Sequence, residues 1–365
     1  MKWSDVRYLH LEISALCNAV CPQCARYPTA SYYEHPNIKP TDLWSIEQVQ
    51  QRLPATDLVN IQEYLLNGTM GDFITNRDAL EIVQYLAISS PGAKFTINTN
   101  GSARNSAWWS SLAQIPNLTV NFALDGLEDT HHLYRRQTNW NQIIENAKSF
   151  IKAGGTADWT MTIFEHNQHQ VEACKEMALS FGFDKFYARH SDRTIVPARD
   201  RKDNVTHWLL PAKNSPMPAF KKAEEASLRQ KEINFKIGKL TSNQEHNNIP
   251  LLSLDNCDSL KFKSIYIGGN WSVAPCCFLG IMSFTQTGDH RFENFLNALT
   301  EAGLTMQDLV ADTKTVGQIV DRGFAWIYDR ITTERALTGC FYHCHPDKSN
   351  YRASQASLTI IYNRQ

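Results

Sequence analysis

The sequence contains no long apolar run and no excess of charge of either sign. No stretch approaches the roughly 20 consecutive apolar residues that a membrane-spanning helix needs, so we expect no membrane association. Lysine and arginine number 36 and aspartate and glutamate 37, which indicates no nucleic-acid partner. The first residues, MKWSDVRYLHLEIS, are too polar for a signal peptide. We therefore expect a cytoplasmic protein in a reducing compartment.

The nine cysteines are not expected to form disulfides in such a compartment. The chain of 365 residues is long enough to bury a core without them. Cys17, Cys21 and Cys24 lie near one end with the spacing C-x3-C-x2-C, and five further cysteines lie between residues 257 and 344. This clustering favours metal binding. Cys174 stands apart in a helical stretch, and we expect it to be a small buried apolar residue.

Strand and helix patterns alternate in the first half of the chain. Helical periodicity predicts helices over residues 77–88, 106–115, 140–155 and 170–183. Between them, β-rich runs predict strands at residues 7–14, 58–68, 94–101, 118–126, 157–167 and 185–191. This alternation predicts an α/β fold, with a parallel sheet covered by helices. Periodicity alone leaves open whether the sheet is doubly wound or forms a curved partial barrel.

The composition divides the chain into three predicted parts. Residues 1–191 carry the strand–helix alternation. Residues 192–250 are polar, and we expect an insert or linker that could contact a substrate, with one charged helical run at 219–232. Residues 251–365 are more compact and cysteine-rich, and the segment 263–277 predicts a hairpin with a Gly-Gly-Asn turn.

Cys17, Cys21 and Cys24 leave an incomplete ligand set. Structural zinc takes four ligands, and ordinary cubane iron–sulfur clusters take four thiolates. A cubane held by three thiolates leaves one iron open to a small ligand that chelates through an amine and a carboxylate. A zinc site completed by a distant His or Cys, or simply reduced buried thiols, are the alternatives.

The segment CNAVCPQC, which follows the strand LHLEIS, resembles the signature of the radical S-adenosylmethionine (radical SAM) family. The resemblance implies a [4Fe–4S] cluster held by Cys17, Cys21 and Cys24, with S-adenosylmethionine (SAM) as the ligand of the open iron. Gln23 stands where the family usually has an aromatic residue near the adenine.

Later segments resemble the other SAM-binding parts of the family in the same order. They are LNGTMGDF, INTNG, FALDG, HHLYRRQ and IFEHN, and the resemblance covers residues 7–191. It implies a partial (β/α)6 TIM-like barrel. It also implies cofactor contacts for Gly71, Asp72, Thr99, Asn100, Asp125, Arg135 and Asn167.

The resemblance also implies an enzyme of the oxidoreductase type. An external one-electron donor such as flavodoxin or ferredoxin would reduce the cluster, and SAM would be cleaved to a 5′-deoxyadenosyl radical. That radical would remove a hydrogen atom from the substrate, while the protein orients and insulates the reactants.

The cysteines of the C-terminal part are enough to close a second site. The segment SIYIGGNWSVAPCC resembles the hairpin of the auxiliary-cluster tails called SPASM and twitch, with Trp271 where a glycine usually falls. The resemblance implies one auxiliary [4Fe–4S] cluster in a small cysteine-rich domain, and zinc is the alternative. The expected ligands are Cys257, Cys276, Cys340 and Cys344, with Cys276 preferred to Cys277.

Three hypotheses remain for the function. The first is modification of a peptide or protein side chain, which tails of this kind commonly serve. The second is oxidation, epimerisation or rearrangement of a small metabolite such as a sugar or an aminocyclitol. The third is an iron–sulfur electron carrier without catalysis.

Overall fold

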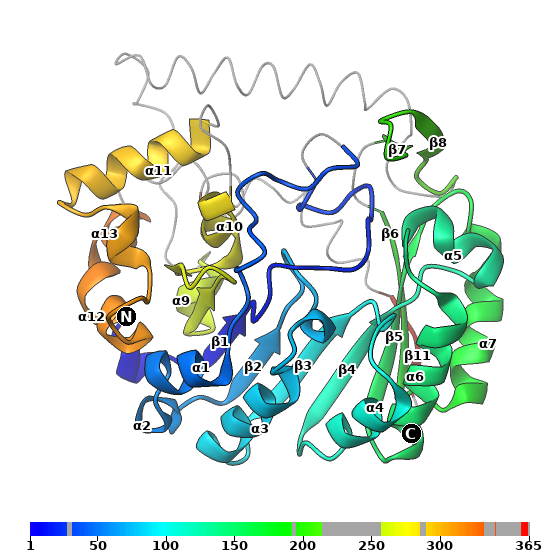
Figure 1. Ribbon diagram of the computed structural model, residues 1–365, viewed down its shortest axis with the longest axis horizontal. Coiled ribbons are helices and arrows are strands. Elements are labelled where there is room, and N and C mark those ends of the chain that lie inside the picture. Colours follow the sequence, from blue (N-terminus) through cyan, green and yellow to red (C-terminus); the bar gives the residue numbers. More distant parts are fainter. Residues whose placement is uncertain are drawn as a thin grey trace.

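A mixed sheet forms the centre of the protein. The computed structural model describes residues 1–27, 31–191, 195–213, 257–284, 290–331, 340 and 359–363. The strand order is β10-β9-β1-β2-β3-β4-β5-β6-β11 (Figure 1). The neighbours from β9 to β6 pair in parallel, and the two outermost strands are antiparallel. This arrangement confirms the predicted α/β fold with a parallel sheet.

The strands of the first half follow the prediction closely. They are β1 (Tyr8–Leu11), β2 (Glu63–Leu66), β3 (Lys94–Thr99), β4 (Leu118–Ala123), β5 (Thr156–Ile163) and β6 (Lys185–His190). The second of them begins later than predicted, because the start of the run 58–68 belongs to α2 (Ala55–Leu58) and the turn after it.

Helices lie between these strands, and their ends have clear local causes. They are α1 (Ile46–Arg52), α3 (Ala79–Ser89), α4 (Ser106–Leu112), α5 (Glu128–Tyr134), α6 (Trp140–Lys152) and α7 (Val171–Phe181). Asn139 caps α6 by accepting from the N–H of Gln142 at 3.0 Å. Gly182 ends α7 with a φ of 84°. Cys174 of α7 is fully buried, as predicted.

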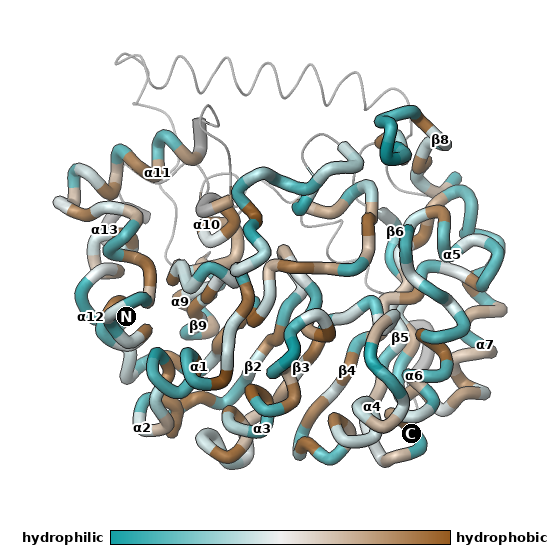
Figure 2. The backbone as a smooth tube through the Cα atoms, viewed as in Figure 1, coloured by the Kyte–Doolittle hydropathy of each residue, from teal (hydrophilic) through white to brown (hydrophobic). Residues whose placement is uncertain are grey.

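The two faces of the sheet differ in character. In β4, Leu118, Val120 and Phe122 are buried in the core, while Thr119, Asn121 and Ala123 line a cavity. Figure 2 shows hydrophobic and hydrophilic residues alternating along the chain. A flat parallel sheet covered by helices on both faces would carry apolar residues on both. The polar inner face therefore fits a curved sheet of the partial-barrel type.

The C-terminal part extends this sheet at both edges. Its strands are β9 (Ser264–Ile267), β10 (Val273–Ala274) and β11 (Thr359–Asn363). β9 and β10 form the predicted hairpin, and β9 pairs in parallel with β1, while β11 pairs with β6. The helices of this part are α9 (Asp258–Lys261), α10 (Cys277–Gly280), α11 (His290–Glu301), α12 (Val316–Gly323) and α13 (Ala325–Ile331).

The geometry of the hairpin turn explains how Trp271 can stand at a position where the SPASM and twitch tails usually have a glycine. Its φ of 64° is left-handed, a conformation that glycine adopts without strain. The indole stacks on Trp44 with ring centroids 3.9 Å apart, and the guanidinium of Arg52 lies 4.6 Å from its ring. These contacts oppose the backbone strain.

The described part of the polar insert contains structure that the sequence did not predict. Strands β7 (Val196–Arg199) and β8 (Val205–Leu209) form a separate antiparallel hairpin. The charged helical run predicted at 219–232 lies outside the described residues. Within the described ranges, every helix is too short or too polar to cross a membrane.

Candidate active site

The candidate site is a cavity of about 670 Å³ that opens at the carboxyl ends of the strands. Cys17, Cys21 and Cys24 line it, together with residues 68–72 and Arg135. Its walls continue between the strands toward their amino ends. Ligands of α/β folds bind at the carboxyl ends of parallel strands, so the cysteine loop lies where such a site is expected.

The cysteine loop is anchored by hydrogen bonds to its own backbone and to a neighbouring loop. The N–H of Cys24 donates to the carbonyl of Cys21 at 3.0 Å, and the Tyr27 N–H donates to that of Cys24 at 3.1 Å. Arg26, 2% exposed, donates to the carbonyls of Ala15 and, at 2.9 Å, Met70. The loop therefore has a defined shape that turns the thiols toward the cavity.

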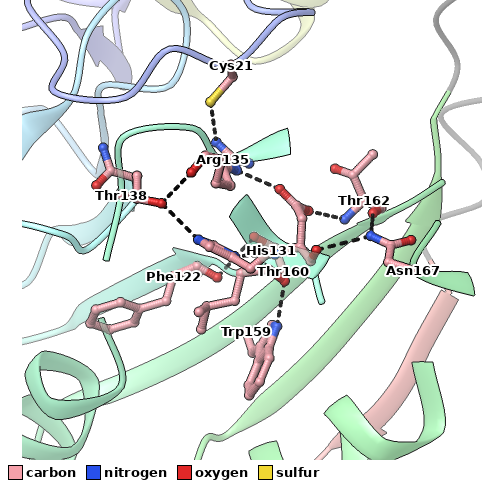
Figure 3. Close-up of polar contacts among 12 residues, drawn as sticks. Cys21, Phe122, His131, Arg135, Thr138, Trp159, Thr160, Thr162 and Asn167 are labelled. Carbon is pink, nitrogen blue, oxygen red and sulfur yellow. Dashed lines mark hydrogen bonds and ion pairs between the residues drawn. The ribbon is translucent and has the colours of Figure 1, made fainter. Parts of the chain in front are cut away.

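Polar donors approach two of the sulfurs. The side-chain amide of Asn100 lies 3.6 Å from the Cys17 sulfur, and Arg135 Nη1 lies 3.8 Å from the Cys21 sulfur (Figure 3). Burial raises the pKa of Cys21 to about 12, and Arg135 opposes this shift. The Cys21 thiol is thus protonated without metal, and metal binding would release its proton.

The donor set fits a cluster better than a single ion. In the part of the chain that the structure describes, no three His, Cys, Asp or Glu side chains converge on one metal position. The thiols that hold a cubane need not converge on one metal position, because each thiolate binds a different iron. Three thiols around one cavity, with donors directed at two of their sulfurs, meet this requirement.

Asp72 joins the ends of β2 and β3 beside the cysteine loop. It is 4% exposed and accepts from Thr99 Oγ1 and from the backbone and side-chain nitrogens of Asn100, each at 2.7 Å. The adjacent Gly71 must lack a side chain, because a Cβ there would lie 1.8 Å from the Ser14 carbonyl oxygen. The structure thus brings together four of the residues predicted to contact the cofactor.

Glu12 is a residue that the sequence prediction missed. It is fully buried, and its carboxylate accepts from the backbone N–H groups of Thr69 at 2.8 Å, Met70 at 3.1 Å and Gly71 at 3.1 Å. Asn67 donates to it from its side chain at 3.1 Å. Glu12 therefore fixes the loop after β2. An acidic residue within the predicted strand 7–14 was the available signal.

An ion pair closes the opposite wall of the cavity. Arg135 Nε lies 2.5 Å from a carboxylate oxygen of Asp125 (Figure 3). Asp125 also accepts from the N–H of Thr162, and Asn167 donates to the carbonyls of Asp125 at 3.1 Å and Thr162 at 3.0 Å. Arg135 lines the cavity, whereas Asp125 and Asn167 lie behind the wall and hold it. Asp125 and Asn167 were both predicted to contact the cofactor directly.

The second missed group lies on β5 and β6, with Asp158 and Lys185 deep in the cavity and Arg189 near the carboxyl end of β6. Asp158, Lys185, Tyr187 and Arg189 line the same cavity. Their spacing follows the two-residue period of a strand. The charged and polar residues at alternate positions of the predicted strands were the signal that could have found them.

Cys276 and Cys277 are adjacent in the C-terminal part of the chain but have different surroundings. Burial raises the pKa of Tyr328, and the charges of Cys257, Cys276 and Cys340 act on it in the same direction. Cys257 and Cys276 occupy the N-cap positions of α9 and α10. The fourth predicted ligand, Cys344, lies outside the described residues.

Cys277 is directed toward the barrel instead. Burial lowers the pKa of His10, but hydrogen bonds to Cys277 and Glu12 and their charges outweigh it and raise that pKa to about 9. The Cys277 charge also acts on Tyr8 and Tyr266, which flank His10 on β1 and β9. The neighbouring thiols thus belong to two separate environments.

Comparison with known proteins identifies the domain to which the cavity belongs. Residues 11–178 match the model of the Radical SAM superfamily. These residues are similar to the radical SAM domain, whose members carry a [4Fe–4S] cluster and use SAM. Members of this superfamily are enzymes that catalyse radical chemistry, so the predicted enzyme class is confirmed.

Solved structures share the fold at low sequence identity. Streptococcus suis SuiB is 15% identical with a TM-score of 0.50, over 92% of this chain and 74% of that chain. SuiB bound to its precursor peptide SuiA is 16% identical with a TM-score of 0.49, over 86% and 66%. Native anSMEcpe with bound AdoMet is 15% identical with a TM-score of 0.44, over 76% and 74%. None of the curated proteins matches the sequence.

Proposed function

We propose that the protein modifies a side chain of a peptide or protein substrate by radical SAM chemistry. The observation that carries this proposal is one continuous cavity. Three cysteine thiols stand at its mouth, and polar side chains of β3 to β6 line its depth. The cysteine end suits the cluster and SAM, and the deeper end suits the hydrogen-bonding groups of a peptide.

Each residue at the cysteine end has a defined task in this proposal. When bound, the [4Fe–4S] cluster and SAM supply the 5′-deoxyadenosyl radical that abstracts a hydrogen atom from the substrate. Cys17, Cys21 and Cys24 hold the cluster. Glu12 orients the loop after β2, whose carbonyls receive the ammonium group of SAM. Arg135 receives the carboxylate of SAM.

The remaining predicted contacts act around these groups. Asp72 and Thr99 hold Asn100 in place beside Cys17, and Gly71 permits the close approach of the two loops. Asp125 and Asn167 keep Arg135 in its position. The electron comes from an external one-electron donor such as flavodoxin or ferredoxin.

We further propose an auxiliary [4Fe–4S] cluster held by Cys257, Cys276, Cys340 and Cys344. The common effect of the first three on Tyr328 supports a shared site. The direction of Cys277 toward His10 supports Cys276 as the ligand. Such a cluster would relay an electron from the substrate to an acceptor or to the first cluster.

Anaerobic quantitation of iron, sulfide and zinc in the reconstituted protein tests both sites. We expect about eight irons per chain in the wild type and about four in Cys17→Ala/Cys21→Ala/Cys24→Ala. That variant should release no 5′-deoxyadenosine from SAM in the presence of dithionite. Cys174→Ala, which removes a core thiol, is the matched control and should keep both clusters.

The auxiliary site has its own pair of variants. Cys276→Ala should reduce the iron content to about four per chain, whereas Cys277→Ala should keep about eight. Zinc retained in place of the second set of irons would make the C-terminal site structural. The reverse pattern in the two variants would assign the ligand to Cys277.

A further inference from the structure

The inner face of β6 presents three side chains to the cavity. Lys185, Tyr187 and Arg189 occupy alternate positions and line it together. Within the described ranges of the chain, none of these side chains forms a hydrogen bond or an ion pair. A lysine, a phenol and an arginine in a row are hydrogen-bond donors, and the nearest charged acceptor on this face is Asp158, opposite Lys185.

The neighbouring strand adds one acceptor to this face. Asp158 is 4% exposed, lies opposite Lys185 in the sheet, and lines the same cavity. Its Oδ1 is buried and has no hydrogen-bond partner. A buried carboxylate oxygen without a donor costs free energy, so the site is suited to a ligand that donates a hydrogen bond.

The arginines at the cysteine end of the same cavity differ from those of β6, because they form ion pairs within the protein. Arg26 pairs with Glu34, and Arg135 pairs with Asp125. The protein therefore satisfies the charges that position the cofactor and leaves those of β5 and β6 available. Arg189 and Lys185, opposed by a single carboxyl group, give the β6 wall of the cavity a preference for anions.

The register of the two strands shows how far apart these groups lie. Asp158 pairs with Lys185, and Thr162 pairs with Arg189. Four residues of parallel strand separate the two levels, which corresponds to about 13 Å along the sheet. A ligand that reaches both levels must be elongated, as a peptide side chain with its backbone is, rather than a single sugar ring.

We propose that the barrel interior binds a peptide segment that carries a carboxylate side chain. Arg189 receives the carboxylate, and Asp158 accepts a hydrogen bond from a second polar group of the same segment. This inference rests on the function proposed above and adds the substrate class. Arg189 and Asp158 are binding residues and take no part in cofactor cleavage.

Acetylated and amidated hexapeptide pools test this preference. Each pool has randomised flanks and one fixed central residue, which is Glu, Gln or Lys. Binding to the reconstituted wild type is measured by calorimetry without reductant, and 5′-deoxyadenosine release is measured with dithionite. We expect the Glu pool to bind about tenfold more tightly than the Gln pool, because a charge-assisted hydrogen bond to arginine is lost.

Two arginine variants test whether Arg189 causes the preference for the Glu pool over the Gln pool. Arg189→Gln should bind the Glu and Gln pools equally. The matched control Arg77→Gln, which changes a side chain that is 81% exposed, should keep the tenfold difference. An equal response of the wild type to the three pools, or a Lys preference, overturns the inference, and so does a Glu preference that survives in Arg189→Gln.

Release of 5′-deoxyadenosine without any peptide separates this inference from the proposed function. If the wild type releases it but shows no Glu preference, the radical SAM function stands and the substrate class is wrong. If the wild type with a full iron content releases none under any condition, the proposed function itself fails.

Discussion

The two ends of the cavity use the same kinds of side chain for opposite purposes. At the cysteine end, Arg135 is held by Asp125, and the carboxylate of Glu12 is saturated by N–H donors. On β5 and β6, by contrast, Asp158 has an unpartnered oxygen, and Arg189 has no counter-ion among the described residues.

This difference indicates that the paired charges position the cofactor and that the unpaired charges recognise the substrate. A charge that already has its partner keeps one position and can orient a cofactor of fixed chemistry. A charge without a partner is stabilised when a ligand arrives, and it selects that ligand by complementarity. The comparison predicts different consequences for substitutions at the two ends.

The largest effect is expected for Glu12→Ala. The substitution leaves the N–H groups of Thr69, Met70 and Gly71 without their acceptor in a buried place. Urea unfolding should show a loss of about 2–4 kcal/mol in the free energy of unfolding, and the affinity for SAM should fall as the loop loses its shape. Glu145→Ala, on the exposed side of α6, is the control.

Glu12→Gln refines the same prediction. The amide keeps one acceptor oxygen but brings a donor toward N–H groups, so its effect should lie between those of the wild type and Glu12→Ala. Unchanged SAM affinity in both variants would show that this loop does not contact the cofactor.

Asp125→Asn should have the next largest effect. It removes the charge that, against the opposing effect of burial, raises the pKa of Arg135 well above its usual range. Arg135 stays protonated but is less well held, so SAM binding should weaken by up to about tenfold with little change in the iron content. Calorimetric titration with SAM measures this, and Asp203→Asn, whose side chain is 58% exposed, is the control.

A normal SAM affinity in Asp125→Asn would indicate that Arg135 does not receive the SAM carboxylate. A loss of iron in the same variant would instead assign the ion pair to the support of the Cys21 sulfur, which Arg135 approaches at 3.8 Å.

The smallest effect is expected at Asp158, and it depends on pH. Burial raises the pKa of Asp158 to about 6, with Lys185 opposing the shift. The folded protein therefore binds more protons than the unfolded chain between the ordinary pKa and about 6. The stabilising contribution is present at low pH and is lost as the pH rises through about 6.

Thermal unfolding of the wild type and Asp158→Asn between pH 5 and pH 7 tests whether ionisation of Asp158 destabilises the folded protein. The variant has no carboxyl group to ionise, so its advantage in melting temperature over the wild type should grow between pH 5 and pH 7. An advantage that is constant or shrinks with pH would mean that Asp158 is solvated or paired in the folded state.

Part of the fold could be predicted because it depends on local patterns. The β-rich runs located the strands up to residue 191, and helical periodicity located α3, α4, α6 and α7 between them. The hairpin β7–β8 was missed because most of its residues are not buried, so no continuous buried face imposes a pattern on them.

The candidate site was predicted less completely, for a similar reason. Cys17, Cys21 and Cys24 are close in the chain, so their spacing is visible. Glu12 and the loop at 69–71 are distant in sequence, and only their packing at adjacent strand ends makes them partners.

The sequence by itself determined the class of chemistry and the parallel α/β core. Cysteine spacing and strand periodicity are local properties that need no knowledge of distant contacts. Only the tertiary structure decided that Cys276 and Cys277 face different environments, and that Asp125 and Asn167 support Arg135 from behind. It also decided that Asp158 and Arg189 share one cavity, because strand register sets which side chains meet.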